Sequence, residues 1–348
     1  MKLKTSSFIS LLGLILCVNT YASTATSLQG AGATYPYPLY IKMFDEYHKK
    51  TKVKVNYQGI GSGGGIRQLK AKTVDFGATD AFITDPYINK HFKTDILHIP
   101  ICSGGVAITF NLDKISSIKL TADVLSNIYQ GKIVYWNNPQ ITALNPDITL
   151  PKLRITPVFR ADSSGTTLIF TDYLSKTSPS WEKNYGSGKT IRSRIGISGK
   201  GNAGVASLIK QIKGSIGYVG TVYAIQNKMP VTSIQNKAKH FIIPNLESIT
   251  NAVENTIPSD SRTSISNTTN PKGYPIAGLT WLIIYKNQAY KNRTQKDYQD
   301  LKKLISWMIS DGQAYAPDLS YAPLSENLQN IAQDIISKME YVPSEQDS

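Results

Sequence analysis

Three segments of this chain share one pattern: a strand-like run, then glycine and hydroxyl residues, then a helical pattern. They are residues 30–38 (GAGATYPYP), 59–65 (GIGSGGG) and 160–167 (RADSSGTT). Glycine lets backbone N–H groups turn toward one point, and the start of the following helix adds partial positive charge. Taken singly, each segment is also compatible with a plain turn or a capped helix. Together they predict an α/β fold in which several helix N-termini surround one desolvated anion.

The number of hydrogen-bond donors matters because an anion is costly to take out of water. Burying an unpaired ion costs tens of kcal/mol in an idealised apolar medium, whereas each hydrogen bond to a charged group returns about 1.5–3 kcal/mol. Arg160 brings a fixed fork of donors suited to an oxyanion, and Asp162 is close enough in sequence to hold that fork in place. Hydroxyls and an open amide come from Thr34, Ser164, Thr166 and Gly165.

Asp80, in the sequence TVDFGATDA, does not fit a simple anion trap. A carboxylate repels a fully ionised ligand, but it accepts a hydrogen bond from a ligand that still carries a proton. Phosphate near neutral pH has such a proton and sulfate does not. Asp80 is therefore predicted to select phosphate over sulfate. The alternative is a loop aspartate that caps a turn.

The rest of the chain alternates strand and helix patterns around a core. Strands are predicted at 53–57 and 155–159, and helices are expected to begin near Pro36 and Ile66. A run rich in Ser, Thr and Asn at 259–270 predicts a surface loop leading into a change of domain. The apolar stripes that predict buried helix faces are Leu39, Met43 and Tyr47; Phe170 and Leu174; Tyr298, Leu301, Ile305 and Met308; and Leu328, Ile331, Ile335 and Met339.

The first 22 residues have the pattern of a secretory signal peptide. A short basic start precedes an apolar run from Phe8 to Val18, and small residues precede an expected cleavage after Ala22. A buried N-terminal helix is one alternative. A lipid-modified start at Cys17 is another, but Leu16 is large where such a cysteine needs a small neighbour.

Removal of this segment leaves a basic chain with one cysteine. Lys+Arg 38 and Asp+Glu 24 give a net charge of +14, and the loss of Lys2 and Lys4 lowers it to +12. Cys102 then has no internal disulfide partner, so the mature fold depends on its core. Export also separates the chain from ATP and reduced nicotinamide, which disfavours kinases and dehydrogenases.

Two other classes of function stay open on the residues alone. One is an exported phosphatase or a dinucleotide-dependent oxidoreductase, since Gly59, Gly61 and Gly64 match G-x-G-x-x-G. No metal-ligand spacing among the four histidines and no G-x-x-x-x-G-K-[ST] motif accompanies that match. The other is a basic protein that binds polyanions, which predicts steep salt dependence. We expect no enzyme activity, no cofactor, no metal and no nucleic-acid partner.

The motifs GAGATYP, YQGIGSGGGIRQ, TVDFGATD and RADSSGTT, in this order and spacing, resemble those of the secreted phosphate-binding proteins of bacterial ABC phosphate transporters. Matches at 131–136, 214–219 and 274–276 extend the similarity over almost all of the mature chain. The resemblance implies a two-lobed, type II periplasmic-binding-protein fold with a two-stranded hinge. Lobe 1 would comprise residues 23–105 and 275–348, and lobe 2 residues 106–274.

The resemblance also implies ligand residues and partners. The positions that match phosphate ligands of the family are Thr34, Tyr35 (through its amide), Ser62, Asp80, Arg160, Ser164, Gly165 and Thr166, with Asp162 as the acid that pairs with the arginine. The implied partners are inorganic phosphate, an ABC permease and its ATPase, and the protein itself would be a soluble periplasmic monomer. Tyr35, Thr79 and Ser163 stand where the family commonly has phenylalanine, serine and glycine.

Overall fold

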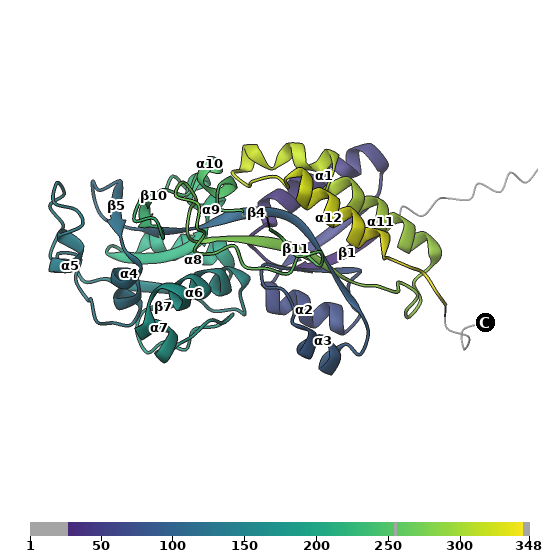
Figure 1. The fold of residues 1–348 in the computed structure, drawn as a ribbon, viewed down its shortest axis with the longest axis horizontal. Coiled ribbons are helices and arrows are strands. Elements are labelled where there is room, and N and C mark those ends of the chain that lie inside the picture. Colours follow the sequence, from purple (N-terminus) through teal and green to yellow (C-terminus); the bar gives the residue numbers. More distant parts are fainter. Residues whose placement is uncertain (1–26, 254–255, 344–348) are drawn as a thin grey trace, which may run out of the picture.

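The computed structural model describes residues 27–253 and 256–343, so the predicted signal peptide lies outside the described residues. Two α/β lobes lie side by side in an elongated molecule (Figure 1). A sheet runs through both lobes in the strand order β2-β1-β3-β11-β4-β8-β6-β7, and β9, β5 and β10 extend it beside β4. The strands are β1 (Ser27–Gly32), β2 (Lys54–Gly59), β3 (Phe76–Thr79), β4 (Ile96–Phe110), β5 (Ser117–Leu120), β6 (Thr156–Arg160), β7 (Ile197–Gly199), β8 (Ser215–Gly220), β9 (Val231–Gln235), β10 (Phe241–Ile242) and β11 (Ala277–Tyr285).

Helices cover both faces of the sheet in each lobe. In the lobe that holds β1, α1, α11 and α12 lie on one face and α2 and α3 on the other (Figure 1). In the second lobe, α6 and α8 pack on opposite faces of β8. The helices are α1 (Tyr37–Thr51), α2 (Ser62–Lys70), α3 (Asp85–His91), α4 (Ala122–Tyr129), α5 (Pro139–Thr142), α6 (Gly165–Thr177), α7 (Pro179–Asn184), α8 (Gly201–Gln211), α9 (Thr221–Gln226), α10 (Leu246–Thr250), α11 (Gln295–Met308) and α12 (Glu326–Ser337), with 3₁₀ turns η1 (Asp311–Tyr315) and η2 (Pro317–Leu319).

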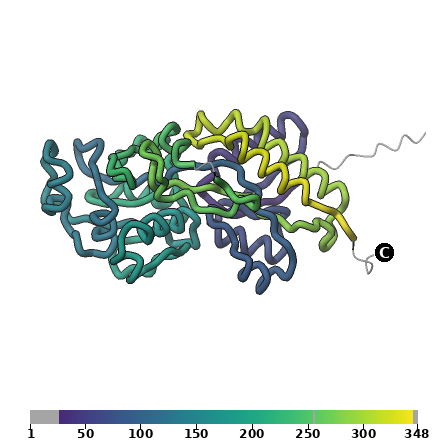
Figure 2. The backbone as a smooth tube through the Cα atoms, viewed as in Figure 1, coloured from purple at the N-terminus to yellow at the C-terminus, as the bar shows by residue number. Residues whose placement is uncertain are grey.

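A pair of neighbouring backbone segments joins the lobes. Strand β4 pairs with β11 over residues 96–105 and with β8 over residues 106–110, so one strand belongs to both lobes. The returning chain lies beside it, with Val106 N donating to Ile276 O at 2.7 Å. The first and last described segments therefore lie in one lobe and the middle of the chain forms the other, as the colours of Figure 2 show. This is the two-stranded hinge that the resemblance implies.

Most predicted elements are found close to their expected positions. The strands predicted at 53–57 and 155–159 are β2 and β6, and the apolar stripes lie on α1, α6, α11 and α12. Met339 is buried but lies beyond the end of α12 at Ser337. Helix α1 begins at Tyr37, with Pro36 as its N-cap, one residue later than expected.

The start of α2 differs more from the prediction. The helix begins at Ser62 rather than near Ile66, so its first turn contains three successive glycines. A Cβ on Gly65 would lie 2.5 Å from the Ala31 carbonyl oxygen and 2.6 Å from Gly32 Cα. Helix α2 can pack this closely on β1 only because residue 65 is a glycine and has no side chain. Tertiary packing thus overrides the poor helix propensity of glycine.

The polar run at 259–270 is less exposed than predicted. It forms no helix or strand, but Ser261, Ile265 and Thr268 are buried. Ser261 Oγ donates to the His98 carbonyl at 3.0 Å and accepts from Trp281 Nε1 at 3.0 Å. Its hydroxyls therefore satisfy buried polar groups, which composition alone does not reveal.

We expect Gly65→Ala to lower the free energy of unfolding by about 1–3 kcal/mol, because the new methyl group meets backbone atoms that cannot move aside. Urea denaturation measures this change. Gly204→Ala in α8 is the matched control, since its Cβ would approach other atoms no closer than 3.3 Å, and it should change stability by under about 1 kcal/mol. Equal effects of the two substitutions would contradict this account of α2.

Candidate functional site

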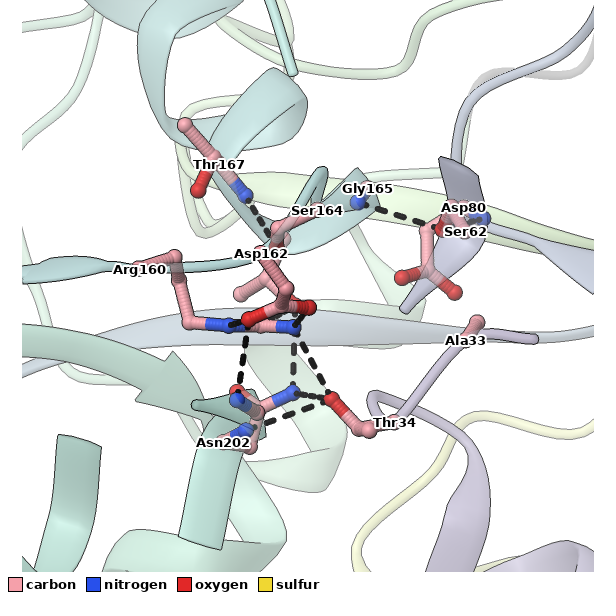
Figure 3. A network of polar contacts seen from close by, with 12 residues as sticks. Ala33, Thr34, Ser62, Asp80, Arg160, Asp162, Ser164, Gly165, Thr167 and Asn202 are labelled. Atoms are coloured by element: carbon pink, nitrogen blue, oxygen red, sulfur yellow. Dashed lines mark hydrogen bonds and ion pairs between the residues drawn. The ribbon is translucent and has the colours of Figure 1, made fainter. Parts of the chain in front are cut away.

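The three glycine–hydroxyl segments meet between the lobes (Figure 3). Arg160 ends β6, and Ser164 is the N-cap of α6 in the same lobe. From the other lobe come Thr34, after β1, and Ser62, the first residue of α2. All four side chains are buried. The N-termini of α2 in one lobe and of α6 in the other therefore point toward the same region, which is the convergence that the sequence predicted.

Arg160 forms the centre of the polar network. Its Nε and Nη2 donate to the two carboxylate oxygens of Asp162 at 2.8 and 2.5 Å. Nη1 donates to Thr166 Oγ1 and Nη2 to Thr34 Oγ1, both at 3.2 Å. The second of these contacts crosses between the lobes. The predicted role of Asp162, to hold the guanidinium, agrees with this bidentate geometry.

The ion pair with Arg160 also affects the pKa of Asp162. Burial alone would raise the pKa of this carboxyl, but the hydrogen bonds and charge of Arg160, with the Gly201 amide, hold the pKa below its ordinary value. Gly201 N donates to Asp162 Oδ1 at 2.9 Å. Asp162 is therefore ionised at neutral pH and offsets the charge of the guanidinium.

A second set of contacts between the lobes depends on Ser62. Its Oγ accepts hydrogen bonds from the amide of Gly165 at 3.1 Å and from that of Asp80 at 3.2 Å. A Cβ on Gly165 would lie 2.5 Å from Ser62 Oγ, so glycine is needed for this approach. Gly63 N also donates to Ser163 O at 2.9 Å. Ser163, one of the departures from the family pattern, therefore takes part in this contact.

Asp80 is buried directly after β3, and none of the described backbone amides donates to its carboxylate, so it does not cap a turn. Thr280 Oγ1, from the hinge strand β11, donates to Asp80 Oδ1 at 2.8 Å. Burial raises the pKa of Asp80 to about 7, although the Thr280 hydrogen bond and the charge of Arg160 act in the opposite direction. The carboxyl consequently titrates near neutral pH when the site holds no ligand.

Sequence reasoning missed Asn202 at the start of α8. Its Nδ2 donates to Thr34 Oγ1 at 2.9 Å and to Thr166 Oγ1 at 3.2 Å, and its backbone amide reaches Thr34 Oγ1 at 3.2 Å. Because Thr34 Oγ1 accepts these bonds, its own proton is free to donate. The sequence did contain a pattern that could have indicated Asn202. Strand β7, Lys200 and Gly201 form a fourth strand–glycine–helix segment.

Two predicted residues have a second role in the fold. Ser164 Oγ accepts from Thr167 N at 3.1 Å and so caps α6, while its hydroxyl proton can still donate. The Tyr35 ring is buried in the core and its carbonyl accepts from Tyr321 OH at 2.5 Å. No described residue accepts a hydrogen bond from the Tyr35 amide.

The described residues contain no group of three or more His, Cys, Asp or Glu side chains that could hold a metal ion. Within the same ranges, none of the helices has the length and apolar character required to cross a bilayer. Two α/β lobes joined by paired strands, with buried donors from both lobes converging between them, define a two-lobed binding protein.

Comparisons with known proteins agree with this class. A model of the PBP superfamily domain matches residues 19–312. The phosphate-binding protein PstS of Haemophilus influenzae is 39% identical over 305 residues, 86% of this chain and 89% of the relative. PstS of Pasteurella multocida is 39% identical over 322 residues, 90% of this chain and 92% of the relative. The chain belongs to the PBP superfamily and, within it, to the PstS family of phosphate-binding proteins.

Solved structures show the same fold at low sequence identity. A high-affinity periplasmic phosphate-binding protein, PfluDING, aligns with a TM-score of 0.74 and 18% identity, over 89% of this chain and 93% of that one. A phosphate-binding protein from Stenotrophomonas maltophilia aligns with a TM-score of 0.70 and 17% identity, over 89% and 94% of the two chains. The fold is therefore the predicted type II, two-lobed arrangement.

We expect Asp80→Asn to stabilise the phosphate-free protein increasingly as pH rises. The pKa of Asp80 is about 7 in the folded protein, above its ordinary value of 3.8. The stabilisation that the protonated carboxyl gives the folded protein is therefore fully present below pH 3.8 and is lost as the pH rises to 7. The advantage of the variant should grow by on the order of 2 kcal/mol between about pH 5 and about pH 8. Urea denaturation at several pH values measures it.

The exposed Asp318→Asn is the control for this experiment. It should leave the pH profile of unfolding unchanged, because the Asp318 side chain is exposed to water. Parallel profiles for Asp80→Asn and the parent protein would show that Asp80 does not titrate near neutrality.

Proposed function

We propose that the protein binds inorganic phosphate between its lobes, outside the inner membrane, and delivers it to an ABC permease and its ATPase. The observation that carries the proposal is the contact of Thr34 with Arg160 and of Ser62 with Gly165 across the lobe boundary. Because of these two contacts, hydrogen-bond donors from both lobes lie around one buried region between the lobes. The names of the PstS relatives support phosphate as the ligand.

The proposed ligand residues are those of the sequence prediction, joined by Asn202. They are Thr34, the Tyr35 amide, Ser62, Asp80, Arg160, Ser164, the Gly165 amide, Thr166 and Asn202. Arg160 is neutralised by Asp162, so attraction to the anion comes mainly from local dipoles and hydrogen bonds rather than from net charge. Such a site depends on geometry and favours a tetrahedral oxyanion that satisfies every donor.

Phosphate binding would favour the closed arrangement of the lobes, since ligand groups come from both. We propose lobe 1 as residues 23–105 and 275–348 and lobe 2 as 106–274, with the division at the hinge, where Gly105 pairs with Ala277. A permease that recognises the closed form would receive loaded protein only. The predicted signal peptide, with cleavage expected after Ala22, supports a periplasmic location, and we propose that the protein is a soluble monomer there.

The geometry favours a binding protein over the oxidoreductase that G-x-G-x-x-G suggests. A Cβ on Gly61 would lie 2.3 Å from Asp162 Oδ2, and one on Gly63 would lie 2.3 Å from Ser163 Oγ. The other lobe therefore occupies the space in which a pyrophosphate would rest. The buried donors also argue against a polyanion-binding surface, and the relatives are named as binding proteins.

Arg160→Gln should weaken phosphate binding by about 100-fold or more, because it removes charge-assisted hydrogen bonds and leaves Asp162 to repel the anion. Calorimetry on phosphate-stripped protein measures the affinity. The exposed Arg192→Gln in the same lobe is the control and should bind like the parent. Unchanged phosphate affinity in Arg160→Gln would place the ligand elsewhere.

Sulfate should bind more tightly at low pH than at high pH. Ionised Asp80 repels sulfate, whereas below its pKa of about 7 the protonated carboxyl can donate to it. We expect sulfate affinity to rise by about tenfold between about pH 8 and about pH 6. Asp80→Asn should bind sulfate at both pH values and lose most of this dependence. Equal sulfate affinity of the parent protein at both pH values would remove the selective role of Asp80.

A further inference from the structure

A second cavity lies between the lobes, next to Asp80 and outside the Arg160 network. Its volume is about 340 Å³, in the lower part of the range for sites that hold small molecules. One wall is formed by Leu168 and Ile169 of α6, and the opposite wall by Phe82 and Trp281 of the other lobe. The cavity therefore exists only where the two lobes face each other.

Lys189 is the basic residue among the described residues that line this cavity. It lies in the segment 187–189, which is fixed to α6 by three hydrogen bonds: Ser164 N to Lys189 O at 2.9 Å, Gly188 N to Thr171 Oγ1 at 3.0 Å, and Thr171 Oγ1 to Gly188 O at 3.0 Å. The side chain is half-buried. No described carboxylate forms an ion pair with it, and burial lowers the pKa of its amine.

The two carboxyls that line the cavity do not compensate Lys189. Asp172 accepts from Lys176, Ser264 and Ser266, so its charge is already satisfied. Asp80 is mostly protonated at pH 6, since burial raises its pKa to about 7. The cavity lining thus combines apolar side chains and hydroxyl residues with a lysine that forms no ion pair with a described carboxylate, which is the chemistry of a site for a small organic anion.

We propose that this cavity is a second binding site, for a small amphiphilic monoanion such as an aromatic or short-chain carboxylate. The anionic group pairs with Lys189, and the apolar body packs against Leu168, Ile169 and Trp281. Inorganic phosphate suits this cavity less well, because Leu168, Ile169 and Trp281 in its lining offer no donors to replace the water around a strongly hydrated anion.

An occupant of the cavity contacts both lobes and so favours the closed form. In the terms of the proposed function, it would slow phosphate release without competing with phosphate. This consequence rests on the proposed function, whereas binding to the cavity does not.

Calorimetry with benzoate at pH 6 tests the site directly. We expect one benzoate per chain, the same number in the presence of phosphate, and no comparable binding of neutral benzyl alcohol. Lys189→Met should weaken benzoate binding by about tenfold or more, as expected for the loss of a charge-assisted contact. Leu168→Trp, which fills the cavity, should also weaken it.

Lys183→Met is the matched control, because Lys183 is an exposed lysine on α7 of the same lobe. It should bind benzoate like the parent protein. Absence of benzoate binding up to its solubility limit, displacement by phosphate, or equal affinity in Lys189→Met would each overturn the proposal.

Phosphate release, followed by stopped-flow fluorescence, separates this proposal from the proposed function. Benzoate should slow release in the parent protein and not in Lys189→Met. Benzoate binding that leaves release unchanged would overturn the coupling between the sites. Benzoate binding to a protein that takes no phosphate would uphold the cavity site and overturn the proposed function.

Discussion

The buried contact between Arg160 and Thr34 is the interaction on which the rest of the site depends. A guanidinium that is only 1% exposed requires a partner, and Asp162, two residues further along the chain, provides it. With the fork fixed by Asp162, the remaining donors of Arg160 reach Thr166 and, across the lobe boundary, Thr34. In the proposed function, closure of the lobes and assembly of the site are therefore one event.

Asp80 makes this site sensitive to protons. Its environment is poor in water and contains one nearby cation that Asp162 already neutralises, so burial prevails and raises the pKa to about 7. A carboxyl with an ordinary pKa would reject sulfate at every physiological pH. In the proposed function, the raised pKa makes rejection of sulfate depend on pH and links ligand choice to the protonation of a single group.

Much of the fold and most of the candidate site could be predicted from local patterns. Residues such as Ser62 and Arg160 stand at strand–glycine–helix junctions, where a short segment already fixes the direction of its amides. Asn202 was missed because its junction, with Lys200 and Gly201, contains no hydroxyl residue to mark it. The loop predicted at 259–270 lies only partly on the surface, because composition does not show that Ser261 bonds to a buried carbonyl.

The sequence by itself determined the alternation of strands and helices, the pairing of Arg160 with Asp162, and the family, because each of these depends on neighbouring residues or on motifs in order. Only the tertiary structure decided that α2 begins in a run of glycines, that Thr34 contacts Asn202, and that a cavity with Lys189 lies beside Asp80. These features depend on the distance between segments far apart in the chain, and that distance is fixed by how the two lobes close on each other.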